Sequence, residues 1–306
     1  MDTKQIEYIL KIAEENNITK AAEKLFITQS ALNQQLLKLE KELGTPLFHR
    51  SRTNWRLTEA GEIYIEGAKA ALQIKNTTYN RIYDVVSARK GHLTIGLTPG
   101  RGLRMFTSIY PELHRSFPNL DVRPIEMRVR AQQDAIAKGE IDVGLMTLAR
   151  RDQTSDTYYP LKQEELVLII PAGHPLAEKA APSGEPLATL DLTELRYEPF
   201  VLMDKTSTLR SSCDLLFEKA GFAPNILFET NNTSGIAAMV QSTLCCGIIP
   251  RYYTLGLTEG VACFSLPERP SWEIVISCQK NGYLNSGARE FIRLAREYWE
   301  NSAPLF

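Results

Sequence analysis

The chain of 306 residues has few of the features that a secreted, membrane-bound or metal-binding protein requires. Its five cysteines form no CxxC pair and its four histidines are scattered, which argues against a disulfide framework and a zinc site. No basic segment followed by an apolar one opens the chain, so we expect no signal peptide. No run approaches the ~18 apolar residues of a membrane helix. We therefore expect a cytoplasmic protein with no membrane partner, no metal and no cofactor.

The sequence also lacks the common catalytic motifs. It contains no GxxxxGK[ST] phosphate loop, no HExxH and no GxSxG. No histidine has a cysteine or carboxylate nearby in an arrangement that suggests a nucleophile and its base. No catalytic residue is predicted, and a cytosolic enzyme on a two-lobed α/β fold stays only as a weaker alternative.

Charge is unevenly distributed along a chain of otherwise ordinary globular composition. Hydrophobic residues make up 43% and charged residues 23% of it, and the formal net charge is −1. Residues 1–58 carry nine Lys and Arg against seven Asp and Glu, with the arginines clustered at residues 50–56. A local basic surface of this kind can contact nucleic acid even in a neutral protein.

Residues 18–43 contain two short helical patterns separated by a break at residues 26–28. Thr19 and Thr28 stand where a hydroxyl can cap the first turn of each helix. In the second helix one buried stripe is predicted from Leu32, Leu36, Leu39 and Leu43. Two helices with a tight turn, over about residues 18–37, are typical of a helix-turn-helix.

The opposite face of the second helix is polar. Amide side chains pair bidentately with adenine and a serine hydroxyl bonds to any base, so this face suits a major groove. A helical hairpin with a merely solvated outer face is the alternative. The residues predicted to contact DNA from this helix are Thr28, Gln29, Ser30, Asn33, Gln34 and Lys38.

A basic β-hairpin is predicted directly after these helices. Gly44 and Pro46 end the second helix, and residues 47–48 begin a short strand. No carboxylate interrupts residues 49–57, where a polar turn is flanked by arginines. We expect this wing to contact phosphates beside the groove through Arg50, Arg52 and Arg56.

The run AAEKLFITQSALNQQLLKLEKELGTPLFHRSRTNWRLTEAG closely resembles the N-terminal domain of LysR-type transcriptional regulators. So many fixed positions at fixed spacing make the resemblance specific. One departure is Asn33-Gln34, where the family often has Ser-Arg, and the loss of that arginine alters the expected operator preference. The matched positions are Ala21-Ala22, Leu25, residues 28–31, Leu39-Glu40, Leu43-Gly44, residues 46–48, Arg50 and residues 57–61.

A long helix is predicted over residues 59–89, capped by Thr58. Its apolar positions follow a coiled-coil spacing, although one helix lying on its own domain would show the same pattern. In the resembled family this segment is the linker helix through which subunits dimerise, which implies a homodimer or homotetramer on a palindromic operator. The residues assigned to dimerisation are Ile65, Leu72, Tyr79, Ile82 and Val86.

Residues 90–306 alternate short apolar strands with helices, which predicts mostly parallel sheets covered on both faces. Crossovers near Pro160 and Ser265 divide the region into lobe I, residues 90–160 and 266–306, and lobe II, residues 161–265. On the motifs GHLTIGLTP, KGEIDVGLM and PAGHPLA the region resembles the LysR effector domain, itself similar to periplasmic binding proteins. A second departure lies at Thr243 and Cys245, where the family usually has glycines.

The fold class is therefore α+β multidomain. It comprises a winged helix-turn-helix (residues 1–58), a linker helix (residues 59–89) and a two-lobed α/β effector-binding domain (residues 90–306).

Three hydroxyl-bearing turns are predicted to meet in the cleft between the lobes. Each combines a helix N-terminus with a hydroxyl, which favours an anion, although a plain helix cap is the simpler explanation of any one turn. Two arginines beside the second strand add positive charge there, unless they lie on a solvated face. The predicted effector-binding residues are Thr98, Pro99, Gly100, Arg128, Arg130, Thr206, Ser207, Thr208, Thr233 and Ser234.

These observations predict a sequence-specific transcription regulator of the LysR type that a small anionic effector modulates. Its expected partners are double-stranded operator DNA, the effector and RNA polymerase. A thiol-based redox sensor acting through Cys213 keeps the DNA-binding function and changes only the trigger. A transport-binding protein would instead require a signal peptide and no winged domain.

Overall fold

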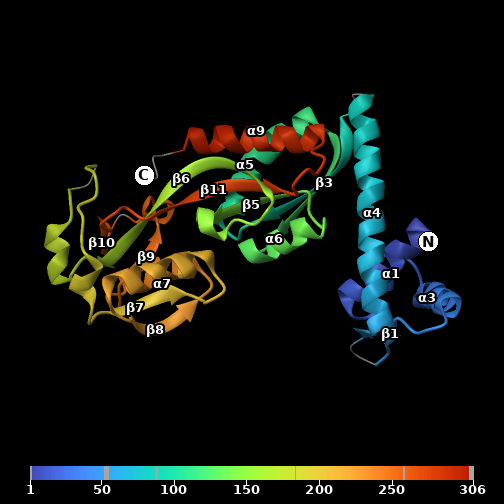
Figure 1. Cartoon of the computed structure of the whole chain (residues 1–306), viewed down its shortest axis with the longest axis horizontal. Coiled ribbons are helices and arrows are strands. Elements are labelled where there is room, and N and C mark those ends of the chain that lie inside the picture. Colours follow the sequence, from blue (N-terminus) through green and yellow to red (C-terminus); the bar gives the residue numbers. More distant parts are fainter. Residues whose placement is uncertain (1, 52–54, 87–88, 183, 258, 303–306) are drawn as a thin grey trace. The chain divides into compact units, whose positions relative to one another are not determined.

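The computed structural model describes residues 2–51, 55–86, 89–182, 184–257 and 259–302 (Figure 1). The chain divides into two compact units, Met1–Val86 with residues 138–140, and Ser87–Ala137 with Ile141–Phe306. We call these the N-terminal and the C-terminal unit. None of the helices in the described ranges has the length and apolar character needed to cross a membrane.

The N-terminal unit is built on three helices, α1 (Thr3–Glu15), α2 (Ile18–Lys24) and α3 (Gln29–Leu43). Thr28 caps α3 as predicted, since its hydroxyl accepts a hydrogen bond from the backbone N of Ala31 at 3.2 Å. The predicted cap at Thr19 is wrong, because Asn17 Oδ1 accepts from the backbone N of Thr19 at 2.9 Å and starts α2 two residues earlier. The two-helix motif and its turn are confirmed.

Buried apolar side chains of all three helices form one core. The predicted stripe of α3 is buried at Leu32, Leu36 and Leu39, whereas Leu43 in the last turn is 46% exposed. Gly44 then adopts a φ of 73°, the left-handed conformation that ends many helices. The antiparallel wing follows, with β1 (Phe48–His49) paired to β2 (Arg56–Leu57). The predicted contact residue Arg52 lies outside the described residues.

The long helix α4 (Glu59–Val85) is capped by Thr58 and ends a few residues before the predicted position 89. Its first half packs on its own unit. Ile65 is only 8% exposed and belongs to the core of the N-terminal unit, so its assignment to a dimer seam is wrong. Leu72 is partly buried against the same core. The exposed members of the predicted seam are Tyr79, Ile82 and Val86.

A mixed sheet organises the C-terminal unit. Its strands are β3 (Lys90–Leu97), β4 (Asn119–Glu126), β5 (Val143–Leu148), β6 (Thr157–Pro171), β9 (Gly247–Pro250), β10 (Val261–Ser265) and β11 (Ser271–Cys278). Parallel pairing joins β3 to β4 and to β5, but β11 and β6 run antiparallel to their neighbours. The expectation of mostly parallel sheets is therefore wrong, because the chain returns to lobe I through the antiparallel strand β11.

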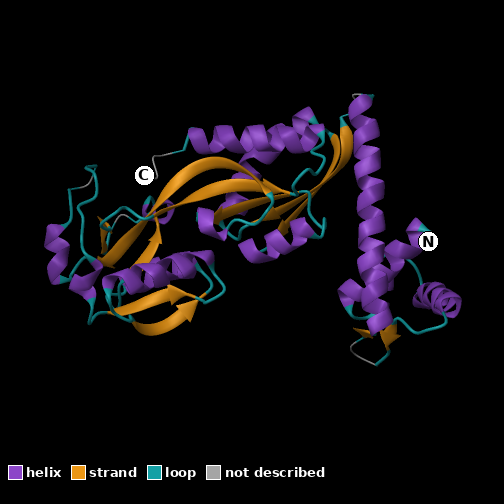
Figure 2. Ribbon diagram, in the orientation of Figure 1, coloured by secondary structure: helices purple, strands orange, loops and turns teal. Residues whose placement is uncertain are grey.

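Helices cover both faces of each lobe, as predicted (Figure 2). In lobe I, α5 (Arg101–Ser116) and α9 (Ser286–Glu300) pack on one face and α6 (Val129–Ala137) on the other. In lobe II, α7 (Thr208–Ala220) and α8 (Thr233–Gln241) cover opposite faces, beside the parallel pair β7 (Pro199–Met203) and β8 (Asn225–Thr230).

One strand, β6, runs through both lobes. Its first half pairs with β11 in lobe I and its second half with β10 and β9 in lobe II. Pro160 lies inside this strand opposite Val275, so the crossover is not at Pro160. The register shifts beside it, where Leu161 of β6 has no partner between Ile274 and Val275 of β11, and such a bulge accommodates a residue that lacks an N–H. The lobes instead meet near Glu164 and Glu165, where the pairing partner of β6 changes.

Thr243, one of the two positions where the resembled family usually has glycine, has a φ of 67° just after α8. A β-branched residue in this region costs roughly 1–3 kcal/mol. We expect Thr243→Gly to raise the free energy of unfolding by about 1 kcal/mol, measured by urea denaturation. Gly221 ends α7 with a φ of 71°, and a Cβ added there would meet no atom within 4 Å, so Gly221→Thr is the reciprocal control and should destabilise. A loss of stability in Thr243→Gly would contradict this account.

Candidate functional sites

The outward face of α3 presents the side chains that the sequence predicts for base reading. Gln29, Ser30, Gln34 and Lys38 are exposed and Asn33 is partly exposed. Leu37, which was not among the predicted residues, is 45% exposed on the same helix and offers an apolar contact of the kind that suits a thymine methyl. The hydroxyl of Thr28 is engaged as the helix cap and lies 3.2 Å from the hydroxyl of Ser30.

The wing is attached to α3 by a buried carboxylate. Glu40, 8% exposed, accepts a hydrogen bond from the backbone N of Leu47 at 2.8 Å and forms an ion pair with Arg50. The Arg50 guanidinium also lies over the ring of Trp55, 5.6 Å from its centroid. The backbone N of Trp55 donates in turn to Asn16 O at 2.8 Å. Arg50 is thus held within its own unit, whereas Arg56 is exposed on β2.

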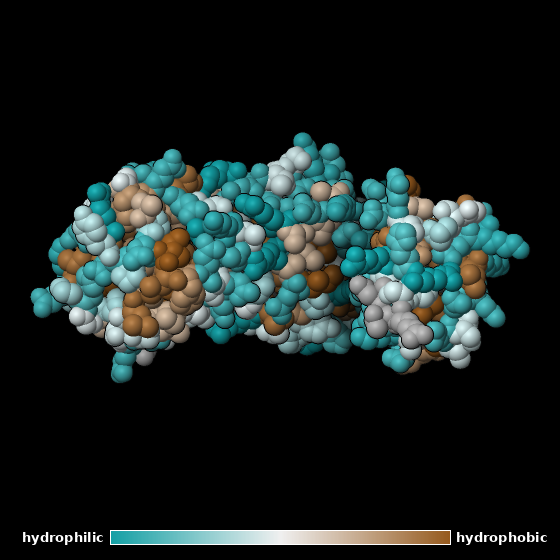
Figure 3. Space-filling view, turned by 90° about the horizontal axis from the view of Figure 1, so that it is seen from below, coloured by the Kyte–Doolittle hydropathy of each residue, from teal (hydrophilic) through white to brown (hydrophobic). Residues whose placement is uncertain are grey.

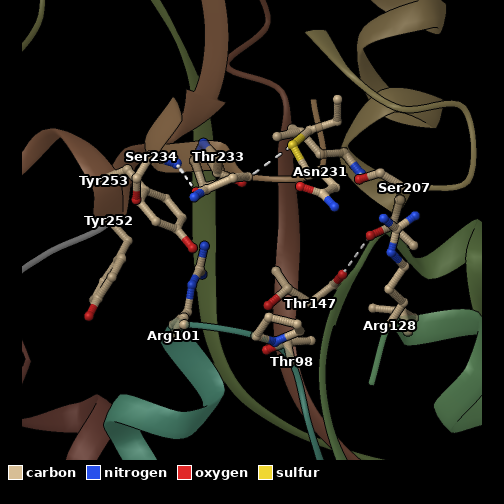
Figure 4. Close-up of a pocket in the computed structure, with 18 of the residues that line it drawn as sticks. Thr98, Arg101, Arg128, Thr147, Ser207, Asn231, Thr233, Ser234, Tyr252 and Tyr253 are labelled. Atoms are coloured by element: carbon tan, nitrogen blue, oxygen red, sulfur yellow. Dashed lines mark hydrogen bonds between the residues drawn. The ribbon is translucent and has the colours of Figure 1, made fainter. Parts of the chain in front are cut away.

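A cavity of about 510 Å³ lies between the two lobes of the C-terminal unit. The three predicted turns meet there, although they are far apart in the sequence (Figure 4). Nine of the ten predicted effector-binding residues line it, namely Thr98, Pro99, Gly100, Arg128, Thr206, Ser207, Thr208, Thr233 and Ser234.

Arg130 is the predicted residue that does not line the cavity. The prediction places Arg128 and Arg130 beside one strand, where residues two apart share a face. The strand β4 ends at Glu126 and helix α6 begins at Val129, so Arg130 lies on the first turn of a helix and is exposed. The assignment of Arg130 to the effector site is therefore wrong.

Arg101 forms part of the cavity wall and was not predicted. It is 6% exposed and forms an ion pair with Glu164, which is fully buried. Its guanidinium lies 4.9 Å from the ring centroid of Tyr252 and 5.3 Å from that of Tyr253. Burial alone would lower the pKa of Arg101, but Glu164 and Tyr253 outweigh it and raise that pKa, so the charge is permanent. Its only sequence signal is its place directly after the first turn.

A second ion pair spans the cavity from lobe to lobe. Arg128 of lobe I donates to Asp204 Oδ1 of lobe II at 2.8 Å and also to the hydroxyl of Thr206. Burial would raise the pKa of Asp204, but hydrogen bonds from Thr206 and Arg128 hold it below its usual range. A further link between the lobes is the bond from Thr208 Oγ1 to Thr147 O at 3.0 Å.

The helix N-termini at the cavity differ in how they are capped. Ser207 caps α7 through the backbone N of Leu209 at 3.2 Å, and Asn232 caps α8 through that of Ser234 at 3.0 Å. The cap residue of α5 is Gly100, which has a φ of 73° and supplies no side-chain bond. Its first two backbone N–H groups are engaged by main-chain carbonyls instead, since Arg101 N donates to Pro99 O at 3.0 Å and Gly102 N to Thr98 O at 3.0 Å. The positive end of the α5 dipole still faces the cavity and favours an anion there.

Four of the five cysteines are buried, and Cys263 is partly buried. Cys213 packs in the core beneath α7, and burial raises the pKa of its thiol to about 12. Burial also raises the pKa of Cys246 to about 12 and that of Cys263 to about 11. Because the thiolate is the reactive form, these values argue against the redox-sensor alternative.

A helix-turn-helix with a wing, joined to a two-lobed domain with an interlobe cavity, defines a DNA-binding regulator with a small-molecule site. The family model described as "Bacterial regulatory helix-turn-helix protein, lysR family" matches residues 3–62, and "LysR substrate binding domain" matches residues 87–300. The chain therefore belongs to the LysR family of transcriptional regulators, and it is a DNA-binding regulator with an effector-binding domain.

One relative supports this membership over nearly the whole chain, and two solved structures share its fold. The HTH-type transcriptional regulator YcgK of Bacillus subtilis is 30% identical over 97% of this chain and 94% of its own length. A full-length OxyR variant from Pseudomonas aeruginosa has the same fold, with a TM-score of 0.69, 20% identity and complete coverage of both chains. CbnR in complex with its target DNA has a TM-score of 0.52 and 21% identity, and the match covers 98% of this chain and 100% of that one.

The buried thiols generate a prediction about reactivity. With a pKa of about 12, roughly one Cys213 thiol in ten thousand is ionised at pH 8. We expect Cys213 and Cys246 to react with iodoacetamide far more slowly in native protein than in urea, as mapped by mass spectrometry of labelled peptides. Labelling of native Cys213 at the rate of a free thiol would restore the redox-sensor hypothesis.

Proposed function

We propose that this regulator reads a palindromic operator through α3 and its wing, and that a small anionic effector in the interlobe cavity modulates it. The observation that carries the proposal is the convergence of three separate hydroxyl-bearing turns and three arginines on one cavity. We keep the bounds predicted from the sequence for the winged domain (residues 1–58), the linker helix (residues 59–89) and the effector-binding domain (residues 90–306). We place the first crossover between the lobes at residues 164–165.

Different parts of the N-terminal unit have different proposed roles on DNA. Gln29, Asn33 and their neighbours on α3 read base edges, with Gln34 and Lys38 at the edge of that face. Arg56 and the predicted contact Arg52 bind phosphates. Arg50 acts by positioning, because its guanidinium is paired with Glu40 and stacked on Trp55.

The proposed homodimer or homotetramer has two exposed apolar surfaces available to it. One is the second half of α4, where Ile74 is 69% and Ile82 is 49% exposed. The other is on lobe II, where Figure 3 shows apolar side chains gathered on one face and where Leu227 and Phe228 of the edge strand β8 are exposed. Burying such surfaces between subunits is favourable, and pairing presents two copies of α3 to a palindrome.

The effector is proposed to act by favouring one arrangement of the lobes. It would do so only if its contacts differ between arrangements, since equal affinity for both shifts nothing. The bridge from Arg128 to Asp204 and Thr206 supports this view, because these groups from both lobes face one cavity. Action in the cytoplasm and contact with RNA polymerase complete the proposal.

Single substitutions separate base reading from phosphate contact. Gln29→Ala should relax base preference at one operator position at a cost of about 1–3 kcal/mol. Arg56→Ala should weaken binding to every sequence and lower the slope of log affinity against log salt by about one. Both are measured by DNA titrations over a series of operators and salt concentrations.

Lys11 pairs with Glu14 on α1, so Lys11→Ala removes one positive charge of this unit without touching α3 or the wing and is the control. Uniform weakening by Gln29→Ala, with base preference intact, would show that α3 is not the reading helix.

The test of the whole proposal is a footprint of the full chain on its own upstream DNA, with and without a panel of small carboxylates. A palindromic footprint that lengthens, shortens or bends with one compound is expected. A footprint that no carboxylate alters would contradict the proposed anionic effector and leave the proposed DNA binding intact. No specific protection at low salt would contradict the proposed operator binding.

A further inference from the structure

The charges around the interlobe cavity are nearly balanced within the protein itself. Among the described residues, the charged side chains that line it are Arg101, Arg104, Arg128 and Asp204. Arg101 is neutralised by Glu164 and Arg128 by Asp204. Arg104 lies one turn after Arg101 on α5 and forms no ion pair in the described part of the chain. The cavity therefore presents one positive charge without a counter-charge.

We propose that Asp204 makes this cavity selective for a monoanion, so that the effector carries one carboxylate on an apolar body. The inference rests on the proposed function, because it concerns the same site. A single carboxylate is matched by the charge of Arg104, which lies in the first turn of α5 at the positive end of the helix dipole. A dianion would bring its second carboxylate into a cavity that already contains Asp204.

Asp204 occupies a position that a second ligand carboxylate would need. It accepts from Arg128 at 2.8 Å and from the backbone N of Thr206 at 3.0 Å, and the hydroxyl of Thr206 adds a third bond. Its own backbone N donates to Thr230 O at 2.8 Å, so the residue is fixed at the ends of β7 and β8. The hydrogen bonds that hold its pKa low keep it ionised at neutral pH. All three bonds go to Oδ1, whereas the buried Oδ2 has no hydrogen-bond partner. A dianion could reach Arg128 only by displacing the Oδ1 atom that Arg128 already contacts.

Beside the hydroxyl-bearing turns, another part of the wall suits an apolar and aromatic body. Tyr252, Tyr253 and Trp272 line the cavity, together with Met203 and Leu209. Figure 4 shows Tyr253 beside the guanidinium of Arg101, with Arg128 on the other side of the view. The ligand class is therefore an aromatic or apolar monocarboxylate.

The test uses matched ligands and the full-length protein. Dissociation constants for benzoate and for its dianionic analogue isophthalate are measured by calorimetry or by the fluorescence of the cavity tryptophan. Wild type should bind benzoate at least about tenfold more tightly than isophthalate, since like charges a few ångströms apart repel strongly in a partly shielded site. Asp204→Asn keeps a hydrogen-bonding side chain and should reduce that ratio about tenfold or reverse it.

The control is Glu268→Gln, which removes one carboxylate of the C-terminal unit outside the cavity, where it is paired with Lys219 of α7. It should leave the ratio unchanged. Arg104→Gln should weaken benzoate binding by more than tenfold. Because Arg104 is exposed, this variant tests the site even if Asp204→Asn folds poorly.

Two results would overturn the inference without harming the proposed function. One is wild-type protein that binds isophthalate as well as benzoate, and the other is a ratio unchanged in Asp204→Asn. If neither these ligands nor the other mono- and dicarboxylates of the footprint panel bind any variant, the anionic effector itself is refuted. Failure of the proposed function can thus be told from failure of this inference, because the first abolishes ligand binding and the second abolishes only the selectivity for a monoanion.

Discussion

The buried carboxylate of Glu164 is the constraint on which the C-terminal unit depends. A charge with no solvent exposure is tolerated only when its partners satisfy it fully. Glu164 receives the Arg101 guanidinium, the indole N–H of Trp272 at 2.8 Å and the backbone N of Tyr252 at 2.9 Å. These three partners come from α5, from β11 and from the segment after β9, and all three residues line the cavity. One wall of the ligand cavity is therefore assembled around a single acid, and the loss of that acid would leave Arg101 buried without its counter-charge.

The N-terminal unit uses the same device at another site. Glu40, also buried, pairs with an arginine that lies over an aromatic ring, as Glu164 does with Arg101 and its two tyrosines. In both places the acid fixes an arginine, although only Arg50 was predicted to contact a ligand and Arg101 was not. Arg50 and Arg101 are positively charged residues beside an anion-binding surface, yet the charge of each is already compensated. Charge available to DNA or to an effector must come from neighbours that lack an internal carboxylate partner.

Periodicity and capping chemistry made the helices, the wing and the convergence of three turns predictable. The errors lie where tertiary packing decides between locally equivalent choices. Ile65 fits a dimer seam or a core equally well until the fold of its own unit covers it. Arg130 shares a face with Arg128 only if the strand continues, and it does not. Asn17 and Thr19 both have side chains that can cap a helix, and only the structure shows that Asn17 caps α2. Arg101, Asp204 and Tyr253 could not be found because their roles depend on partners more than sixty residues away or across the cavity.

The continuity of β6 has a consequence for how this domain can change over evolution. Side chains alternate along the strand, so that Leu168 faces the core under α7 while Ile169 faces the core under α8. The first half of the same strand is held in register by β11. Inserting or deleting one residue of β6 at Glu164 or Glu165 would turn each side chain in the second half of the strand to the opposite face. The two faces of lobe II would then be exchanged. Substitutions in this domain can therefore alter the residues that line the cavity, whereas a change of one residue in the length of β6 between its two halves would exchange the faces of lobe II.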